Sequence, residues 1–362
     1  MIKTAIIGTG MIASSAHIPA YRSRSDVFEL AAVADVNLTA AKALAAEQHI
    51  EKAFENPEQM LKEVRPQLVS ICVPNAFHYS LVKLALQYGA NVLCEKPLAF
   101  SYAEAAELFG LAKKKGLLLM ACQSMRYTPD RQAAKAFVQG GNLGQPYYAS
   151  FSRIRRRGIP YWGTFHIKKF SCGGALCDIG VHILDAALWL MGNPEIQSVS
   201  GRCGKHHANE LGDLAASGAR TGSVQNMRKF NPNEMDVEDF AAGTITFKNG
   251  CTLHFTVAWA ANMPESSDIR LVGEKAGIDV VPGTVYKGEN TNEKLPFLPD
   301  EYKDEAFPGH FHIINNLANV LQNGAAPDIL PEQTIQVSAV IGMFYRSCEL
   351  GRPVLWEEIL ND

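Results

Sequence analysis

A short apolar run followed by a glycine-rich turn opens this chain and constrains its fold more than any other feature. Residues 4–7, Thr-Ala-Ile-Ile, have the composition of a buried strand and lead directly into the sequence G-x-G-x-x-A. A strand that feeds such a turn into a helix is typical of a dinucleotide-binding fold. The first glycine permits the tight turn, the second lets the backbone approach a pyrophosphate, and the alanine allows close packing of helix on strand. Unpaired N–H groups at the helix N-terminus then face the phosphates. The predicted contact residues are Gly8, Gly10, Met11, Ile12 and Ala13.

The next predicted strand ends in an acidic residue that bears on the choice of cofactor. Residues 28–34 are mostly apolar and lead to Asp35, 22 positions after Ala13. An acid at about this distance bonds the ribose 2′-hydroxyl in such folds, so the sequence favours NAD over NADP. Arg22 and Arg24 precede the strand. A loop that folded them back toward the cofactor would keep NADP as an alternative.

Length and composition are those of an ordinary globular protein of two domains. The chain has 362 residues, of which 47% are hydrophobic and 20% charged, and domains hold roughly 150 residues each. A core of this size needs no disulfide or metal for stability. The eight cysteines are scattered without a C-x-x-C pair, which favours buried thiols in a reducing compartment. Cys172 and Cys177 lie near His166 and His182, but their spacing matches no familiar zinc pattern, so no metal is expected.

Charge and hydropathy exclude several classes of partner. The net charge of -3 gives no reason to expect nucleic acid or an anionic membrane surface, and no apolar stretch is long enough to span a bilayer. Met1-Ile2-Lys3 and the small apolar residues after it faintly resemble a signal peptide. Cleavage there would remove the first strand and the glycine turn, so we expect a cytoplasmic protein.

The first third of the chain alternates strands with helices. Predicted strands at 68–73, 91–94 and 117–121 are separated by predicted helices at about 78–88 and 101–115. Continuous apolar strands alternating with helices indicate a parallel sheet covered on both faces. Residues 1–122 are therefore predicted to form a doubly wound α/β domain that binds a dinucleotide.

Beyond about residue 126 the pattern indicates an α+β domain that spans residues 123–362. Residues 243–247 and 251–255 flank Lys-Asn-Gly, a strong hairpin signal, and a second turn joins 269–273 to 277–281. These strands predict a large, mainly antiparallel sheet. The polar stretch of about 205–238 is interpreted as a long loop, which is an active-site cover, an oligomer arm or only a surface loop. A final helix at about 331–350 is predicted, with the option of packing back on the first domain.

Lys96 lies just beyond the predicted strand 91–94, where ligands bind at the carboxyl ends of parallel strands. A lysine at that edge can donate a hydrogen bond to a substrate oxygen, and its charge favours a developing alkoxide. The alternative is a strand-end lysine that is exposed to water and paired with Glu95.

A second polar group lies in the predicted helix that follows Gly173-Gly174. Asp178, His182 and Asp185 have the spacing i, i+4 and i+7, which predicts that they share one helix face. A histidine oriented by a carboxylate suits a base that accepts a hydroxyl proton. An ordinary Asp-His pair that stabilises the helix start is the alternative.

Taken together, these motifs resemble the Gfo/Idh/MocA oxidoreductases over nearly the whole chain. The turn at residues 8–13, Val73-Pro74-Asn75 with His78, Glu95-Lys96-Pro97 and the G-G-x-L-x-D-x-G-x-H helix follow one another in the family's order. The resemblance implies a Rossmann domain followed by a domain with a large open sheet, whose outer face forms dimers or tetramers. It implies Lys96, Asp178 and His182 as the catalytic group. It also implies cofactor contacts from Pro74, Asn75, His78, Glu95, Lys96, Gln123 and Trp162.

For a member of that family we expect an NAD(P)-dependent dehydrogenase that oxidises a secondary hydroxyl of a sugar, sugar derivative or cyclic polyol. Hydride would pass to the nicotinamide C4, while the hydroxyl proton leaves through His182 or Lys96. An NAD-retaining glycosidase without net redox change and a non-catalytic dinucleotide-sensing regulator are the alternatives. The candidate substrate contacts are Lys96, Arg126, Arg156, Tyr161, His166, Asp178 and His182.

The basic segment of residues 153–169 bears on the substrate. Arg153, Arg155, Arg156, Arg157, Lys168 and Lys169 fall within it without an acidic residue, interleaved with Tyr161, Trp162 and Phe165. Such charge suits a carboxylated, phosphorylated or nucleotide-linked sugar. A solvated sheet edge or an oligomer contact is the other interpretation.

Overall fold

The computed structural model describes residues 1–160, 163–207, 230–297 and 299–360, and the chain divides into two compact units. The first unit holds Met1–Ala99, Glu104–Ser124 and Tyr302–Ile335, and the second holds the remaining ranges between residue 100 and the C-terminus. The segment Tyr302–Ile335, which the sequence analysis assigned to the second domain, groups with the first unit. Tyr161, Trp162 and residues 208–229 of the predicted loop lie outside the described residues.

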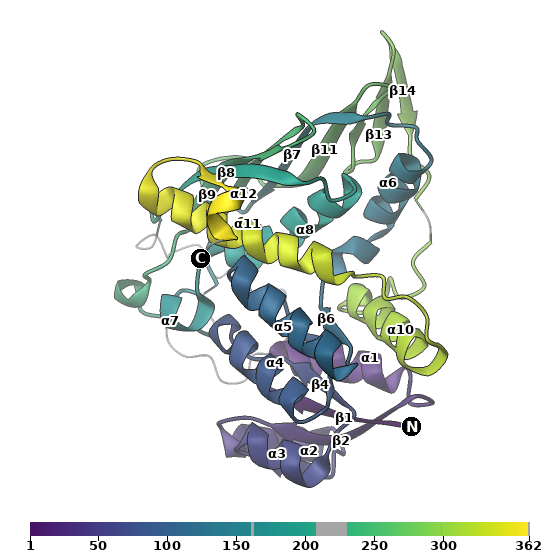
Figure 1. Cartoon of the computed structure of the whole chain (residues 1–362), viewed down its shortest axis with the longest axis vertical. Helices are drawn as coiled ribbons and strands as arrows, with labels where there is room; N and C mark the ends of the chain where they lie inside the picture. The colour runs from purple at the N-terminus through teal and green to yellow at the C-terminus, as the bar shows by residue number, and fades with distance from the viewer. Residues whose placement is uncertain (161–162, 208–229, 298, 361–362) are drawn as a thin grey trace. The chain divides into compact units, whose positions relative to one another are not determined.

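The first unit contains a six-stranded parallel sheet, as predicted (Figure 1). Its strand order, β3-β2-β1-β4-β5-β6, is that of a doubly wound dinucleotide-binding fold. Strands β2 and β3 follow one another on one side of β1, and β4 to β6 follow one another on its other side. Such folds bind their ligands at this switch point between β1 and β4. The strands are β1 (Ile2–Ile7), β2 (Phe28–Ala34), β3 (Lys52–Phe54), β4 (Leu68–Ile71), β5 (Asn91–Cys94) and β6 (Leu119–Ala121).

Helices connect these strands and cover the sheet. Strand residues such as Ala5, Val69 and Val92 are wholly buried, which explains why the strands are continuous apolar runs. Helix α10 (Pro308–Asn323), which the sequence analysis did not predict, packs against α1 and η1 of this unit. The other helical segments are η1 (Ala13–His17), α1 (Ile18–Arg22), α2 (Leu38–Glu47), α3 (Pro57–Val64), η2 (Asn75–Phe77), α4 (His78–Gln87) and most of α5 (Tyr102–Lys115).

The second unit is built on a nine-stranded sheet with the order β14-β13-β12-β11-β7-β10-β9-β8-β15. Strands β7 and β10 pair in parallel and the other pairings are antiparallel, which confirms the predicted mainly antiparallel sheet. The predicted Lys-Asn-Gly hairpin joins β9 to β10. The strands are β7 (Pro146–Ile154), β8 (Ile196–Gly204), β9 (Phe240–Phe247), β10 (Thr252–Ala258), β11 (Ser266–Gly273), β12 (Gly277–Asp279), β13 (Thr284–Lys287), β14 (Thr291–Lys294) and β15 (Val354–Leu355).

Helices pack on one face of this sheet, with α8 at the centre of the core (Figure 1). The stretch Lys168–Leu190, which contains α8, is long and apolar enough to cross a membrane, but 83% of its apolar window is buried inside the protein. It is therefore the core helix of this unit. The helical segments that lie wholly or mostly in this unit are η3 (Ser124–Tyr127), α6 (Pro129–Gln139), α7 (Lys168–Ser171), η4 (Leu176–Gly180), α8 (Val181–Leu190), η5 (Pro232–Glu234), α11 (Pro331–Leu350) and α12 (Trp356–Ile359).

Candidate active site

The predicted cofactor residues of the first unit gather at the carboxyl ends of its strands. Gly8 follows β1, Asp35 follows β2, Lys96 lies two residues after β5 and Gln123 lies two residues after β6. All of these strands are parallel, so the side chains occupy one edge of the sheet. The structure thus brings together at this edge residues that are far apart in the sequence.

The glycine turn has the geometry that a bound pyrophosphate requires. Gly8 has a φ of +96°, and a Cβ added there would lie 2.2 Å from the carbonyl oxygen of Cys72, which follows β4. A Cβ on Gly10 would meet no atom within 4 Å, so the backbone of the turn is open on that side. A ligand can therefore approach the Gly10 backbone, while Gly8 closes the turn against the neighbouring strand.

Asp35 is tied to the glycine turn. Its Oδ2 atom accepts hydrogen bonds from the backbone N–H and the hydroxyl of Thr9, both at 2.9 Å, and its Oδ1 accepts the N–H of Asn37 at 2.9 Å. A carboxylate offers about four acceptor positions, and these three bonds leave room for a ribose hydroxyl. Thr9, which the sequence analysis passed over, thus fixes the acid relative to the turn.

Gln123 supplies a further sign of a ligand at this edge. Its side chain is 1% exposed, and its amide oxygen Oε1 has no hydrogen-bond partner among the described residues. An unpaired buried acceptor is costly, and a bound group with an N–H or O–H would satisfy it. Together with the open backbone at Gly10, this atom shows that the edge fits a dinucleotide.

His78, a predicted cofactor contact, braces two loops of this edge. Its ring nitrogens lie 2.7 Å from the Pro97 carbonyl oxygen and 2.9 Å from that of Val73. The loop that carries Pro74 and Asn75 is thereby joined to the loop that carries Lys96. The cofactor contacts predicted for Pro74, Asn75 and His78 stay predictions.

Glu95 and Lys96 differ in their surroundings although they are adjacent. Glu95 is 6% exposed, and its Oε1 atom lies 2.9 Å from the Nε2 atoms of both His17 and His310. Although burial alone would raise the pKa of Glu95, the two histidine hydrogen bonds hold it well below its usual value. Lys96 is half-buried, and its backbone N–H donates to Glu95 Oε2 at 3.3 Å. The Glu95 carboxylate is therefore engaged by hydrogen bonds from residues of the first unit.

The predicted catalytic helix of the second unit is buried almost throughout. Of the residues from Gly173 to Leu190, only Asp178, His182 and Trp189 are half-exposed, and the others are buried. Trp259, directly after β10, donates its indole N–H to Asp178 Oδ2 at 2.9 Å. The structure therefore places Asp178 and His182 at the accessible part of a rigid helix, with Asp178 oriented by a tryptophan that the sequence analysis missed.

Asp185 does not behave like the other two polar residues of this helix. It is 1% exposed, and its carboxylate receives two hydrogen bonds from Arg126, Nε at 2.7 Å and Nη2 at 2.5 Å. The three polar residues therefore do not form one exposed face, because Asp185 is buried whereas Asp178 and His182 are half-exposed. Asp178 lies in the π-helical segment Leu176–Gly180, and His182 and Asp185 both lie in α8. Arg126, a candidate substrate contact, is thus engaged in a buried ion pair.

Glu238 holds the start of the predicted catalytic helix, and the sequence analysis missed it. Its carboxylate accepts the N–H groups of Gly174 at 2.8 Å and Leu176 at 3.1 Å, and the hydroxyl of Tyr345 at 2.8 Å. A Cβ on Gly174 would lie 1.9 Å from the Glu238 carbonyl oxygen, which explains the second glycine of the motif. Glu238 lies more than sixty residues after Gly174 and Leu176 in the sequence, so no local sequence signal could have identified it.

The remaining substrate candidates lie in the basic segment. Arg156 is exposed, with its N–H donating to Glu265 Oε1 at 3.2 Å, whereas His166 is buried with its ring centroid 4.6 Å from that of Phe230. The guanidinium groups of Arg155 and Arg157 donate to neighbouring backbone carbonyls. The guanidinium groups of Arg155 and Arg157 thus have hydrogen-bond partners within the segment, whereas Arg156 is exposed.

Comparison with known proteins agrees with this architecture. Residues 2–122 match the family described as "Oxidoreductase family, NAD-binding Rossmann fold", and residues 131–279 match "GFO/IDH/MocA C-terminal domain". D-glucoside 3-dehydrogenase of Escherichia coli (strain K12) is 33% identical over 355 residues, which cover 98% of this chain and 97% of that protein.

Two solved structures share the fold at lower identity. An oxidoreductase domain protein from Kribbella flavida has a TM-score of 0.78 and 22% identity, covering 98% of both chains. The WlbA dehydrogenase from Bordetella pertussis, solved in complex with NADH and UDP-GlcNAcA, has a TM-score of 0.77 and 20% identity, also covering 98% of both chains.

Proposed function

Because the chain belongs to the Gfo/Idh/MocA oxidoreductase family, with its NAD-binding Rossmann fold, we propose that it is an NAD-dependent dehydrogenase of a sugar, sugar derivative or cyclic polyol. The reaction proposed is oxidation of a secondary hydroxyl. The observation that carries this proposal is the pair of half-exposed ionisable side chains, Asp178 and His182, on a helix whose other residues from Gly173 to Leu190, except Trp189, are buried. A purely structural helix in a core has no need of such a pair.

NAD would be held by the glycine turn, Asp35 and the unpaired amide oxygen of Gln123. When bound, it supplies the hydride acceptor for the oxidation. Lys96, at the same strand edge, donates a hydrogen bond to the substrate oxygen and stabilises its negative charge as the proton leaves. The alternative of a solvated Lys96-Glu95 ion pair is less favoured, because the carboxylate already accepts from two histidines.

His182 is assigned as the base that accepts the hydroxyl proton. Asp178 orients the imidazole and favours its protonated form, while Trp259 fixes the carboxylate through Oδ2. Glu238 is a positioning residue, because its carboxylate accepts backbone N–H groups of the first turn of this helix. These roles follow the resemblance to the family residue by residue, and substitution is needed to test each one.

A glucoside is the first substrate to test. The relative with 33% identity is named for oxidation of a D-glucoside, and the local contacts of Arg155 and Arg157 weaken the case for an anionic sugar. Exposed Arg156 leaves that case open. If an anion is the substrate, its Michaelis constant should be lower than that of the neutral sugar at low salt and should rise with salt.

The deciding experiment mixes purified protein with NAD or NADP and a panel of glucosides, aldoses, inositols, anhydrosugars and sugar acids. We expect reduced nicotinamide to form, at a rate that depends on the protein, with glucosides among the substrates. If the protein binds NAD tightly but releases no NADH with any compound, the proposal fails. Cleavage of a glycosidic bond in the same samples would then identify an NAD-retaining glycosidase. If neither NADH nor a cleaved glycoside forms, a dinucleotide-sensing regulator is favoured.

Replacement of Asp35 with Ser should reduce the preference for NAD over NADP. A hydrogen bond to a charged group contributes about 1.5–3 kcal/mol, so the ratio of kcat/KM for the two cofactors should fall by about 10- to 100-fold. The ratio is measured with one substrate at saturation. Glu29→Gln, which removes an exposed carboxylate of β2, is the control and should leave the ratio unchanged. An unaltered ratio in Asp35→Ser would show that Asp35 only supports the turn through Thr9.

The predicted dimer or tetramer and the cytoplasmic location are proposals as well. The large sheet carries a groove lined mainly by small and polar residues, among them Ser150, Ser152, Thr244 and Thr256. Such a surface suits contact with a second copy of the chain. Sedimentation of the purified protein measures its oligomeric state.

A further inference from the structure

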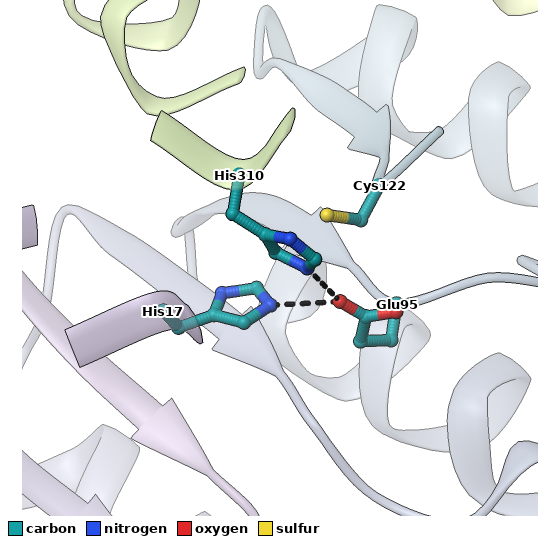
Figure 2. A group of neighbouring side chains, drawn as sticks. All are labelled: His17, Glu95, Cys122 and His310. Atoms are coloured by element: carbon teal, nitrogen blue, oxygen red, sulfur yellow. Dashed lines mark hydrogen bonds and ion pairs between the residues drawn. The ribbon is translucent and has the colours of Figure 1, made fainter. Parts of the chain in front are cut away.

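Four side chains with metal-binding atoms meet inside the first unit. Figure 2 shows His17 from η1, Glu95 after β5, Cys122 after β6 and His310 from the first turn of α10, all pointing toward one another. They are 0–6% exposed, and their candidate ligand atoms all lie within 4.8 Å of one another. The four come from distant parts of the sequence, so no spacing motif identifies them.

The donor set is one that Zn²⁺ accepts. Two imidazole nitrogens, a thiol and a carboxylate oxygen are N, S and O ligands of the kinds found in four-coordinate zinc sites. In a tetrahedral site with metal-ligand distances of 2.0–2.3 Å, neighbouring ligand atoms are about 3.3 Å apart. Here Nε2 of His17 and Nε2 of His310 each lie 2.9 Å from the same Glu95 oxygen. A small outward movement of these side chains would therefore form the site.

The surroundings of His17 provide a second, independent observation. Its other nitrogen, Nδ1, lies 3.2 Å from Ser70 Oγ, and Ser70 Oγ lies 2.7 Å from the hydroxyl of Tyr21. Metal-binding histidines usually engage their second ring nitrogen in this way, which fixes the ring and points the first nitrogen at the metal. The buried chain from Tyr21 through Ser70 thus orients Nε2 of His17 toward the cluster.

The charge of the cluster also favours a cation. The Glu95 carboxylate is buried, and the groups that surround it in the cluster are two imidazole rings and a thiol. A divalent cation at the centre of these groups would pair with the buried carboxylate.

We propose that His17, Glu95, Cys122 and His310 bind one Zn²⁺ ion. The ion would join α10 to the ends of β5 and β6, next to the loop that carries Lys96. The site is independent of the assigned oxidation, because it requires neither a sugar nor a particular reaction. The proposal departs from the sequence-based expectation of no metal, which considered only residues near one another in the sequence.

The test uses the full chain. Zinc content is measured in the purified protein, and chelator-treated protein is then titrated with Zn²⁺ or Co²⁺. We expect about one bound ion per chain, a rise in Tm with added Zn²⁺, and a thiolate-to-metal charge-transfer band in the Co²⁺ form. Cys122→Ser should abolish that band, whereas Cys72→Ser, which changes another buried thiol of this unit, should keep it.

A milder variant guards against misfolding. Ser70→Ala leaves all four ligands in place but removes the partner of His17, so it should weaken Zn²⁺ binding by about 10- to 100-fold. Absence of stoichiometric metal together with no Co²⁺ band in the wild-type protein would overturn the proposal. The same holds if the band persists in Cys122→Ser. Metal content and spectra are read without turnover, so this proposal and the proposed function fail separately.

Discussion

Lys96→Met is expected to lower kcat by about 10²- to 10⁴-fold while NAD binding stays nearly unchanged. Methionine keeps the length and most of the volume of the lysine stem but removes the ammonium group. The variant therefore loses the hydrogen bond and the charge that we propose stabilise the developing alkoxide. The glycine turn, Asp35 and Gln123, which would hold the dinucleotide, keep their contacts. Steady-state rates and titration of NAD by fluorescence measure the two effects.

Lys114→Met, which changes an exposed lysine of α5, is the matched control and should leave both quantities unchanged. If Lys96→Met weakens NAD binding and turnover to the same extent, Lys96 binds the cofactor and the proposed role in stabilising the oxyanion is wrong. Full turnover in the variant would remove Lys96 from the reaction altogether.

Asp185→Asn is expected to reduce the free energy of unfolding of the second unit by about 3–5 kcal/mol. The side chains of Arg126 and Asp185 are only 3% and 1% exposed, and the two guanidinium hydrogen bonds match the carboxylate. Asparagine preserves the shape but leaves the guanidinium buried without its counterion. Trp189, Trp259 and Trp356 lie in the second unit, so tryptophan fluorescence during urea unfolding reports on this change.

A second bidentate pair of the same unit provides the control. Arg352 binds Glu358 through two bonds of 2.9 and 2.8 Å, but the two side chains are 52% and 24% exposed. Solvent screens this pair, so Glu358→Gln should cause only a small loss of stability. If the two substitutions reduce the free energy of unfolding equally, burial does not increase the contribution of the Arg126–Asp185 pair to stability.

Several elements were predictable because their signals are local. The parallel sheet follows from apolar strands that alternate with helices, and the predicted strand 28–34 and helix 331–350 are observed as Phe28–Ala34 and Pro331–Leu350. The hairpin between β9 and β10 follows from its turn residues. Each of these depends on periodicity or turn chemistry within a short window, where sequence and conformation are directly linked.

Contacts between distant segments were not predictable in this way. Asp185 is buried in an ion pair with Arg126, which lies 59 residues away in the sequence, although Asp178 and His182 of the same helical segment are half-exposed. Glu238 reaches the helix start from another segment, and Trp259 reaches Asp178 from the end of a strand. A single sequence carries no signal for such pairs, because they depend on where whole elements pack.

The sequence by itself determined the dinucleotide-binding sheet, the mainly antiparallel second sheet and the positions of Lys96, Asp178 and His182, because each is encoded in a short pattern of residue types. Only the tertiary structure decided what these residues contact. It turned Glu95 inward onto His17 and His310, buried Asp185 against Arg126 and brought Cys122 to the same cluster. The physical reason is that the burial and pairing of a charged group depend on segments far apart in the chain. The positions of those segments relative to one another are set only by the packing of the whole core.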